Sequence, residues 1–309
     1  MADEIAYTGL GNQRLTNVLS TEYELARTDT NWFMSHPAIW KYPQRLNGSG
    51  STTVKVPRLG LDGYDAFAAQ AEGDTVANTA LTDDAQTITI ARQSFRREPS
   101  GVAMITDPLN VLNAPRFVRD FLGAYNARLA NMFAALMSGF STGVGTSGSD
   151  LTLANFLAAK SVLLVGNAMN GVPILSLLHG QQWSDLSEEI TTTSGGSVQL
   201  SVDAQGMLQW AGAGFQGRFL NVDIFVSNRI NTANGGADYA GGMFTRGAVG
   251  WADALPVMDD PTQQVMVADV MLFERSRNAA KDQTAYIGHA YMGVAELDDG
   301  RGVKIVTDA

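Results

Sequence analysis

The chain has 309 residues, of which 45% are hydrophobic and 17% are charged, so it has enough apolar material for a large core. Its 31 acidic and 21 basic residues give a net charge of −10, which argues against a basic surface that grips nucleic acid. It has no cysteine, so disulfide frameworks, thiolate zinc sites, iron–sulfur clusters and cysteine nucleophiles are excluded.

The N-terminal part of the chain has the composition of an arm that packs onto another surface. Its first residues include Asp3 and Glu4 and no basic stretch, so we expect no signal peptide. Apolar residues at near-helical spacing predict an amphipathic helix at 10–30, and an aromatic stretch with two prolines follows it. No run of about 18 apolar residues occurs, so we expect no membrane-spanning helix.

Two alternating segments predict a long β-hairpin. Residues 52–57 and 86–92 alternate between polar and apolar side chains, and a stretch rich in glycine, alanine, aspartate and threonine separates them. Such a hairpin is at best marginally stable alone, so we expect it to lie against something else.

A long helix and a flexible connector follow the hairpin. A broad apolar stripe predicts a helix at 114–140, with Asn113 as its N-cap and Pro115 in its first turn. A helix of this length would form a rod of about 37 Å. The glycine- and serine-rich segment 138–150 is the best candidate for a domain boundary.

The rest of the chain mixes helices and strands without a regular alternation, which indicates the α+β class. We expect helices at 153–166 and 181–190, strands at 172–179, 219–227, 243–251, 264–277, 286–297 and 302–306, and loops at 191–197 and 234–242.

Two glycine motifs match the residue pattern of functional motifs, but not the structural context that those motifs need. Residues 212–217 fit G-x-G-x-x-G, but a strand-like segment follows them where a dinucleotide site needs a helix, so we expect a turn. Residues 139–143 fit G-x-S-x-G, but they leave a helix, whereas a nucleophile elbow leads from a strand into a helix.

The ionisable residues form no recognisable site. His36, His179 and His289 have no metal-ligand spacing, so structural roles explain them best. The pairs Asp259-Asp260 and Asp298-Asp299 adjoin proline or glycine and fit solvated turns.

The base of the hairpin carries a small basic cluster of Arg92, Arg96 and Arg97. Because the chain as a whole is acidic, we expect this cluster to form salt bridges with a neighbouring subunit rather than to bind phosphate. Asn47-Gly48-Ser49 matches the sequon for N-glycosylation, which is relevant only if the chain is secreted. The sequence thus predicts no catalytic, cofactor-binding or metal-binding residue, and a protein that is not an enzyme.

The order of these elements resembles the major capsid protein of tailed bacteriophages over nearly the whole chain. Three stretches carry the resemblance: the strand-then-helix segment of 172–179 and 182–186, the strand segment 217–230, and the small-residue strand 247–251. The resemblance implies an N-terminal arm at 1–46, an extended loop at 47–98, a peripheral domain with a spine helix at 99–140, an axial domain at 141–260, and strands at 261–309 that return to both domains.

The resemblance also implies a function. Members of this family assemble as hexamers and pentamers into an icosahedral shell that encloses packaged double-stranded DNA, and the extended loop of one subunit lies over the next. The implied partners are identical subunits, a portal, a separate scaffolding protein and in some cases a decoration protein, with no membrane and no cofactor. The protein would then be found in the virion, after assembly in the host cytoplasm. Some members form Lys–Asn cross-links, but no feature near Lys55 in the hairpin marks it as reactive.

In this interpretation the shell expands when DNA enters, and glycines at 48, 50, 60 and 63 let the hairpin swing. Deletion of 61–83 is then expected to leave a folded monomer that forms no particles. Three alternatives remain: the shell of a cellular nanocompartment with the same fold, an α+β enzyme with a deep polar pocket, and a tail or decoration protein that forms rings or trimers.

Overall fold

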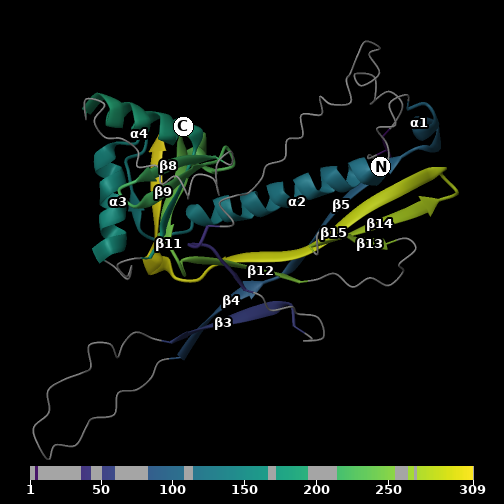
Figure 1. Ribbon diagram of the computed structural model, residues 1–309, viewed down its shortest axis with the longest axis horizontal. Helices are drawn as coiled ribbons and strands as arrows, with labels where there is room; N and C mark the ends of the chain where they lie inside the picture. Colours follow the sequence, from purple (N-terminus) through teal and green to yellow (C-terminus); the bar gives the residue numbers. More distant parts are fainter. Residues whose placement is uncertain are drawn as a thin grey trace, which may run out of the picture.

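The structure is a computed structural model that describes residues 4–5, 36–42, 51–59, 83–107, 114–165, 172–193, 214–254, 264–267 and 270–308. These residues form two seven-stranded sheets, a separate two-stranded hairpin and four α-helices (Figure 1). The helix expected at 10–30, the N-cap Asn113 and the glycines at 48, 50, 60 and 63 lie outside the described residues.

The first sheet is built around β15 (Gln283–Glu296), its longest strand. One edge of β15 pairs with β5 (Ala91–Pro99), and the other pairs first with β14 (Met271–Asn278) and then with β12 (Val249–Ala254). The outer strands of this sheet are β1 (Glu4–Ile5), β2 (Trp40–Tyr42) and β13 (Gln264–Val267). The short helix α1 (Gly101–Ile105) follows β5 directly, and the side chain of Ser100 caps it by accepting a hydrogen bond from the Ala103 amide.

The second sheet has the strand order β6-β16-β11-β7-β9-β8, and β10 pairs with β11. Its strands are β6 (Gly143–Val144), β7 (Ile174–Leu178), β8 (Phe215–Phe219), β9 (Val222–Val226), β10 (Thr232–Ala233), β11 (Asp238–Thr245) and β16 (Gly302–Asp308). The helices α3 (Leu153–Val165) and α4 (Gly180–Thr193) pack beside this sheet, and two 3₁₀ turns lie at Asn234–Gly236 and Asp299–Arg301.

The helix α2 (Ala114–Met137) connects the two sheets. It begins along the first sheet and ends at the second (Figure 1). Its buried residues recur every fourth position, as one face of a helix requires, at Phe117, Phe121, Tyr125, Leu129, Phe133 and Met137. The first two pack with β14 and β15 of the first sheet, and the last four belong to a core that includes residues of both sheets. The sequence predicted this helix, which ends three residues before the expected position 140.

The strands β3 (Thr53–Leu59) and β4 (Asp83–Thr89) form the predicted hairpin, which projects away from both sheets (Figure 1). The helices and strands expected at 153–166, 172–179, 181–190, 286–297 and 302–306 are also confirmed within a few residues. The helix α4 extends to Thr193, so the loop expected at 191–197 begins later than predicted.

Three expected strands are wrong in the same way, because each contains a turn. Residues 219–227 include the two-residue turn between β8 and β9, and residues 264–277 cover the hairpin strands β13 and β14. Residues 243–251 belong to β11 and β12, which lie in different sheets on either side of Gly247. The φ angle of +92° at Gly247 is one that L side chains rarely adopt, so a glycine allows the chain to change sheets here. The loop expected at 234–242 is also too long, since β11 begins at Asp238.

Candidate assembly interface

The described part of the hairpin is anchored to the body at its base. Val54 and Ile88 face one another across the ladder, and both are buried against Ala252 and Leu297 of the body. Lys55, on the opposite face of β3, is exposed. The alternation predicted from the sequence thus places the buried face of the ribbon against the body of its own chain.

The hairpin continues into the first sheet through β4 and β5, which are separated only by Ile90. The amide of Ile90 still donates a hydrogen bond to the carbonyl oxygen of Thr52, at 2.8 Å, so the pairing with the other strand of the ribbon reaches the bend. The ribbon crosses β15 closely at this point: a Cβ at Gly293 would lie 2.1 Å from the carbonyl oxygen of Thr89. Only glycine fits there, and the direction of the hairpin is therefore set by the sheet below it.

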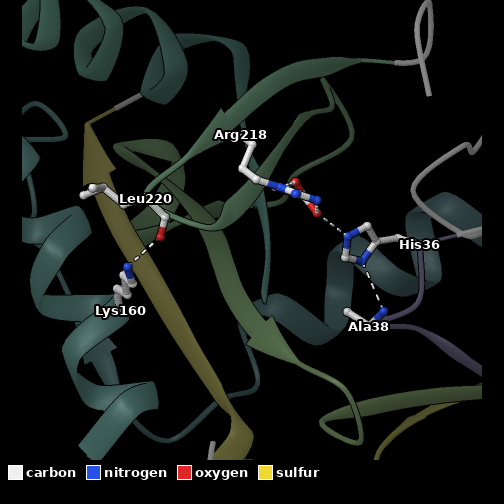
Figure 2. Close-up of polar contacts among 6 residues, drawn as sticks. His36, Ala38, Lys160, Arg218 and Leu220 are labelled. Atoms are coloured by element: carbon white, nitrogen blue, oxygen red, sulfur yellow. Dashed lines mark hydrogen bonds and ion pairs between the residues drawn. The ribbon is translucent and has the colours of Figure 1, made fainter. Parts of the chain in front are cut away.

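A buried polar cluster fixes the segment 36–42 to the second sheet (Figure 2). The His36 Nε2 atom lies 2.8 Å from Asp223 Oδ2 on β9, and the Arg218 guanidinium on β8 contacts both oxygens of the same carboxylate, at 2.6 and 3.1 Å. The side chains of His36 and Asp223 are 0% and 3% exposed. A buried carboxylate is costly unless it is paired and hydrogen-bonded, and here it has both kinds of partner.

The hydrogen bonds of this cluster define its protonation. The backbone amide of Ala38 donates to His36 Nδ1 at 3.1 Å, so Nδ1 is an acceptor and the ring proton is on Nε2, which donates to Asp223. Burial raises the pKa of Asp223, but the hydrogen bonds from His36 and Arg218 and the charge of Arg218 outweigh it and hold this pKa below its usual value. The cluster is therefore an ionised aspartate that is bound by the His36 ring and the Arg218 guanidinium.

The same segment joins the first sheet a few residues later. The strand β2 pairs in parallel with β12, and the Lys41 ammonium lies 2.5 Å from Asp253 Oδ2 on that strand. The Arg246 guanidinium stacks over the ring of Trp40 at 4.1 Å. Residues 36–42 thus contact both sheets and link them to one another.

The other two histidines have structural partners of their own. The His179 ring stacks on Tyr239 with 3.5 Å between centroids, its Nδ1 accepts the Gln181 amide, and burial lowers its pKa. His289 contacts Ser94 through Nδ1 at 2.9 Å, and burial lowers its pKa although Glu274 opposes the shift. The structural roles expected for all three histidines agree with these contacts.

Asp298 and Asp299 lie in the turn that leads from β15 to β16, as their neighbouring glycine suggested. Asp298 pairs with Arg301 at 3.0 Å, and Asp299 accepts the Ser141 amide at 2.7 Å, just beyond the end of α2. Burial, a hydrogen bond to Asp299 and the charges of both aspartates raise the pKa of Glu296 to about 6. A protonatable carboxyl thus lies where the chain passes from one sheet to the other.

The substitution Glu296→Gln should make the subunit less sensitive to pH. Because the folded pKa of Glu296 lies above its usual value of 4.5, the contribution of this residue to stability is complete below pH 4.5 and is lost as the pH rises through about 6. Relative to wild type, the variant should unfold about 1–3 °C higher near pH 7.5 and at the same temperature near pH 4, since solvent screens this partly exposed group. Thermal unfolding at both pH values checks this, and an equal difference at both would contradict it.

The glycine motifs do not form functional sites in the described residues. Gly214 and Gly217 have φ angles of 77° and 134° and flank the start of a strand, so no helix N-terminus follows residues 212–217. Residues 139–143 leave α2 and enter the short strand β6. The pair Asp259-Asp260 and the sequon at Asn47 lie outside the described residues.

Two of the three arginines at the base of the hairpin have an acidic partner on their own chain. Arg97 pairs with Asp120 of α2 at 3.2 Å, and Arg96 pairs with Glu98 on its own strand. Both acidic partners therefore belong to the same chain.

The His36–Asp223–Arg218 cluster was not predicted from the sequence. One signal could have found part of it: a two-residue turn at 220–221 places Arg218 directly opposite Asp223, as the register confirms. Nothing near His36 in the sequence points to a residue so far along the chain.

The described residues contain no group of three or more histidine or acidic side chains arranged to hold a metal ion. Within the same ranges, no helix is both long and apolar enough to cross a membrane.

The fold is similar to those of several solved shell proteins. The capsid protein of Ralstonia phage GP4 has a TM-score of 0.67 and 12% identity, over 100% of this chain and 98% of that one. The head structure of Helicobacter pylori bacteriophage KHP40 gives a TM-score of 0.63 and 12% identity, over 98% of each chain. The encapsulin of the holo-SrpI complex from Synechococcus elongatus gives 0.62 and 12%, over 97% of this chain and 94% of that one.

No family model and no curated protein sequence matches the chain. The structural likenesses nevertheless extend over nearly its full length and include the long helix, both sheets and the hairpin. The chain therefore has the α+β fold of tailed-phage capsid proteins.

Proposed function

We propose that this protein is a major capsid protein, whose copies assemble as hexamers and pentamers into a closed icosahedral shell around double-stranded DNA. The observation that carries the proposal is the projecting hairpin β3–β4, anchored at its base in a fold that solved capsids share. A ribbon that extends beyond the body of a monomer can contact a neighbouring copy. The net charge of −10 is suited to a container, because it does not hold the DNA inside by attraction.

The domain assignment forms part of this proposal. The first sheet, α1 and most of α2 correspond to a peripheral domain, and the second sheet with α3 and α4 corresponds to an axial domain. The strand β12 pairs with β15 of the first sheet, so in this assignment it is counted with the peripheral domain. A portal, a separate scaffolding protein and in some cases a decoration protein would complete the particle, which would assemble in the host cytoplasm and remain in the virion.

The likeness to the encapsulin of Synechococcus elongatus favours a second candidate, the shell of a protein nanocompartment. Both candidates predict a closed homomeric particle. They differ in its contents, which are nuclease-protected double-stranded DNA for a capsid and a protein cargo for a nanocompartment.

We expect the purified protein to form closed particles of megadalton mass. Light scattering measures the mass, electron microscopy shows the shell, and extraction after nuclease treatment identifies the contents of particles formed in the native host cell. A 33.0 kDa monomer or a small oligomer under every assembly condition would refute both candidates, and a tail ring or trimer would show up as an open or small assembly.

A further inference from the structure

The helix α3 is apolar on nearly all sides, although it lies at the surface of the second sheet. Its inner residues Phe156, Ala159 and Leu163 are completely buried. On its outer side, Leu157 is 40% exposed and Val165 is 85% exposed. A surface helix normally presents polar residues to water, and a helix that is apolar all round is normally covered. The described chain leaves this side uncovered.

The charge on this helix is bound by the neighbouring turn. Lys160 is the one charged residue of α3, and its Nζ lies 2.5 Å from the carbonyl oxygen of Leu220, in the turn between β8 and β9 (Figure 2). The ammonium is thus bound to the body of the protein. The whole segment 151–165 contains no aspartate or glutamate, in a chain that has 31 of them.

The turn at Leu220 adds a further apolar side chain beside the helix. Leu220 has a φ angle of 50°, a left-handed conformation that is uncommon for a bulky residue, and its side chain is 47% exposed. We define the α3 face as the exposed apolar residues of this region: Leu157, Val162, Leu164, Val165 and Leu220. Small exposed residues, Ala154, Ala158 and Ser161, lie between the larger ones on the helix and leave room for a partner to approach closely.

We propose that the α3 face is a contact between neighbouring copies of this chain in the assembled shell, an inference that rests on the proposed function. Electrostatics favours a second copy as the occupant. Two copies that each carry a net charge of −10 repel one another, so close contacts between them are favoured at faces without acidic residues. The α3 face meets this condition and also provides the uncharged apolar centre that interfaces require. In a closed ring it meets a different face of the next copy.

A single introduced thiol tests the contact, because the chain has no cysteine of its own. In Val165→Cys, a small maleimide should label the thiol rapidly in dissociated subunits and about tenfold more slowly in particles assembled from the purified chain alone, since interface cores exclude solvent. Ile105→Cys, on the 86% exposed residue of α1, controls for the access of the reagent to the particle and should be labelled at similar rates in both states.

Three results would overturn the proposal. The first is equal labelling of Val165→Cys in both states, and the second is equal protection of both thiols, which the shell wall alone would explain. The third is protection only in particles that contain another protein, which would make that protein the occupant. A wild-type chain that never forms particles would instead refute the proposed function. Because Val165 is almost fully exposed, the variant should fold, and circular dichroism of the subunits verifies this.

Discussion

Replacing residues 60–82 with an Asn-Gly pair should prevent particle formation and leave a folded subunit. The register allows this change, because Leu59 pairs with Asp83 at the end of the ladder and a two-residue turn can connect them. The deletion considered from the sequence, 61–83, would have removed this last paired residue. Val54 and Ile88 keep their buried contacts in the shortened hairpin, so the base should remain anchored.

The loss should be nearly complete, since any contact that this segment makes would be repeated in every subunit of a closed shell. Light scattering measures the particle yield, and thermal unfolding of the subunit measures its integrity. A variant with a glycine–serine segment of the same length in place of 60–82 is the matched control: it should also fail if specific contacts matter, and it should assemble if length alone suffices. Normal particles from the Asn-Gly variant would show that the hairpin has no role in assembly.

The sequence predicted those parts of the fold that depend on local periodicity. The helix α2 has an apolar residue at every fourth position from Phe117 to Met137, and the alternation in β3 and β4 places Val54 opposite Ile88. These patterns repeat over many residues, so no contact with distant parts of the chain was needed to recognise them.

The turns inside β-rich segments were not predictable in the same way. Leu220 and Asn221 form a turn with positive φ angles although leucine is not a turn residue, and the run of apolar residues around them looks like one strand. At Gly247 the chain passes from one sheet to the other, and only the partners of β11 and β12 reveal this change.

Contacts between residues far apart in the sequence could not be predicted either. The α3 face went unrecognised because a helix of apolar residues predicts burial, and the sequence does not show which sides the rest of the chain covers. The role of His36 was equally hidden, since its partner Asp223 is 187 residues away.

Removal of the Asp223 carboxylate should cause the largest loss of subunit stability. In Asp223→Ala, the buried His36 ring loses its acceptor and the partly exposed Arg218 loses its counter-charge, which together should cost about 2–4 kcal/mol. His36→Ala should cost about 1–3 kcal/mol, because Asp223 keeps its arginine. Urea unfolding of dissociated subunits measures both losses.

A double variant measures how much of the lost stability comes from the contact between His36 and Asp223 itself. If the hydrogen bond between His36 and Asp223 fixes residues 36–42, the stability loss in His36→Ala/Asp223→Ala should be smaller than the sum of the single losses by about 0.5–3 kcal/mol.

The sign of the pH dependence of stability is an independent check. Because the pKa of Asp223 is lowered in the folded state, the contribution of this residue to stability is present above its usual pKa of 3.8 and is lost as the pH falls through the folded pKa. Additive losses, or an Asp223→Asn variant as stable as wild type at neutral pH, would show that the carboxylate does not hold residues 36–42 between the two sheets.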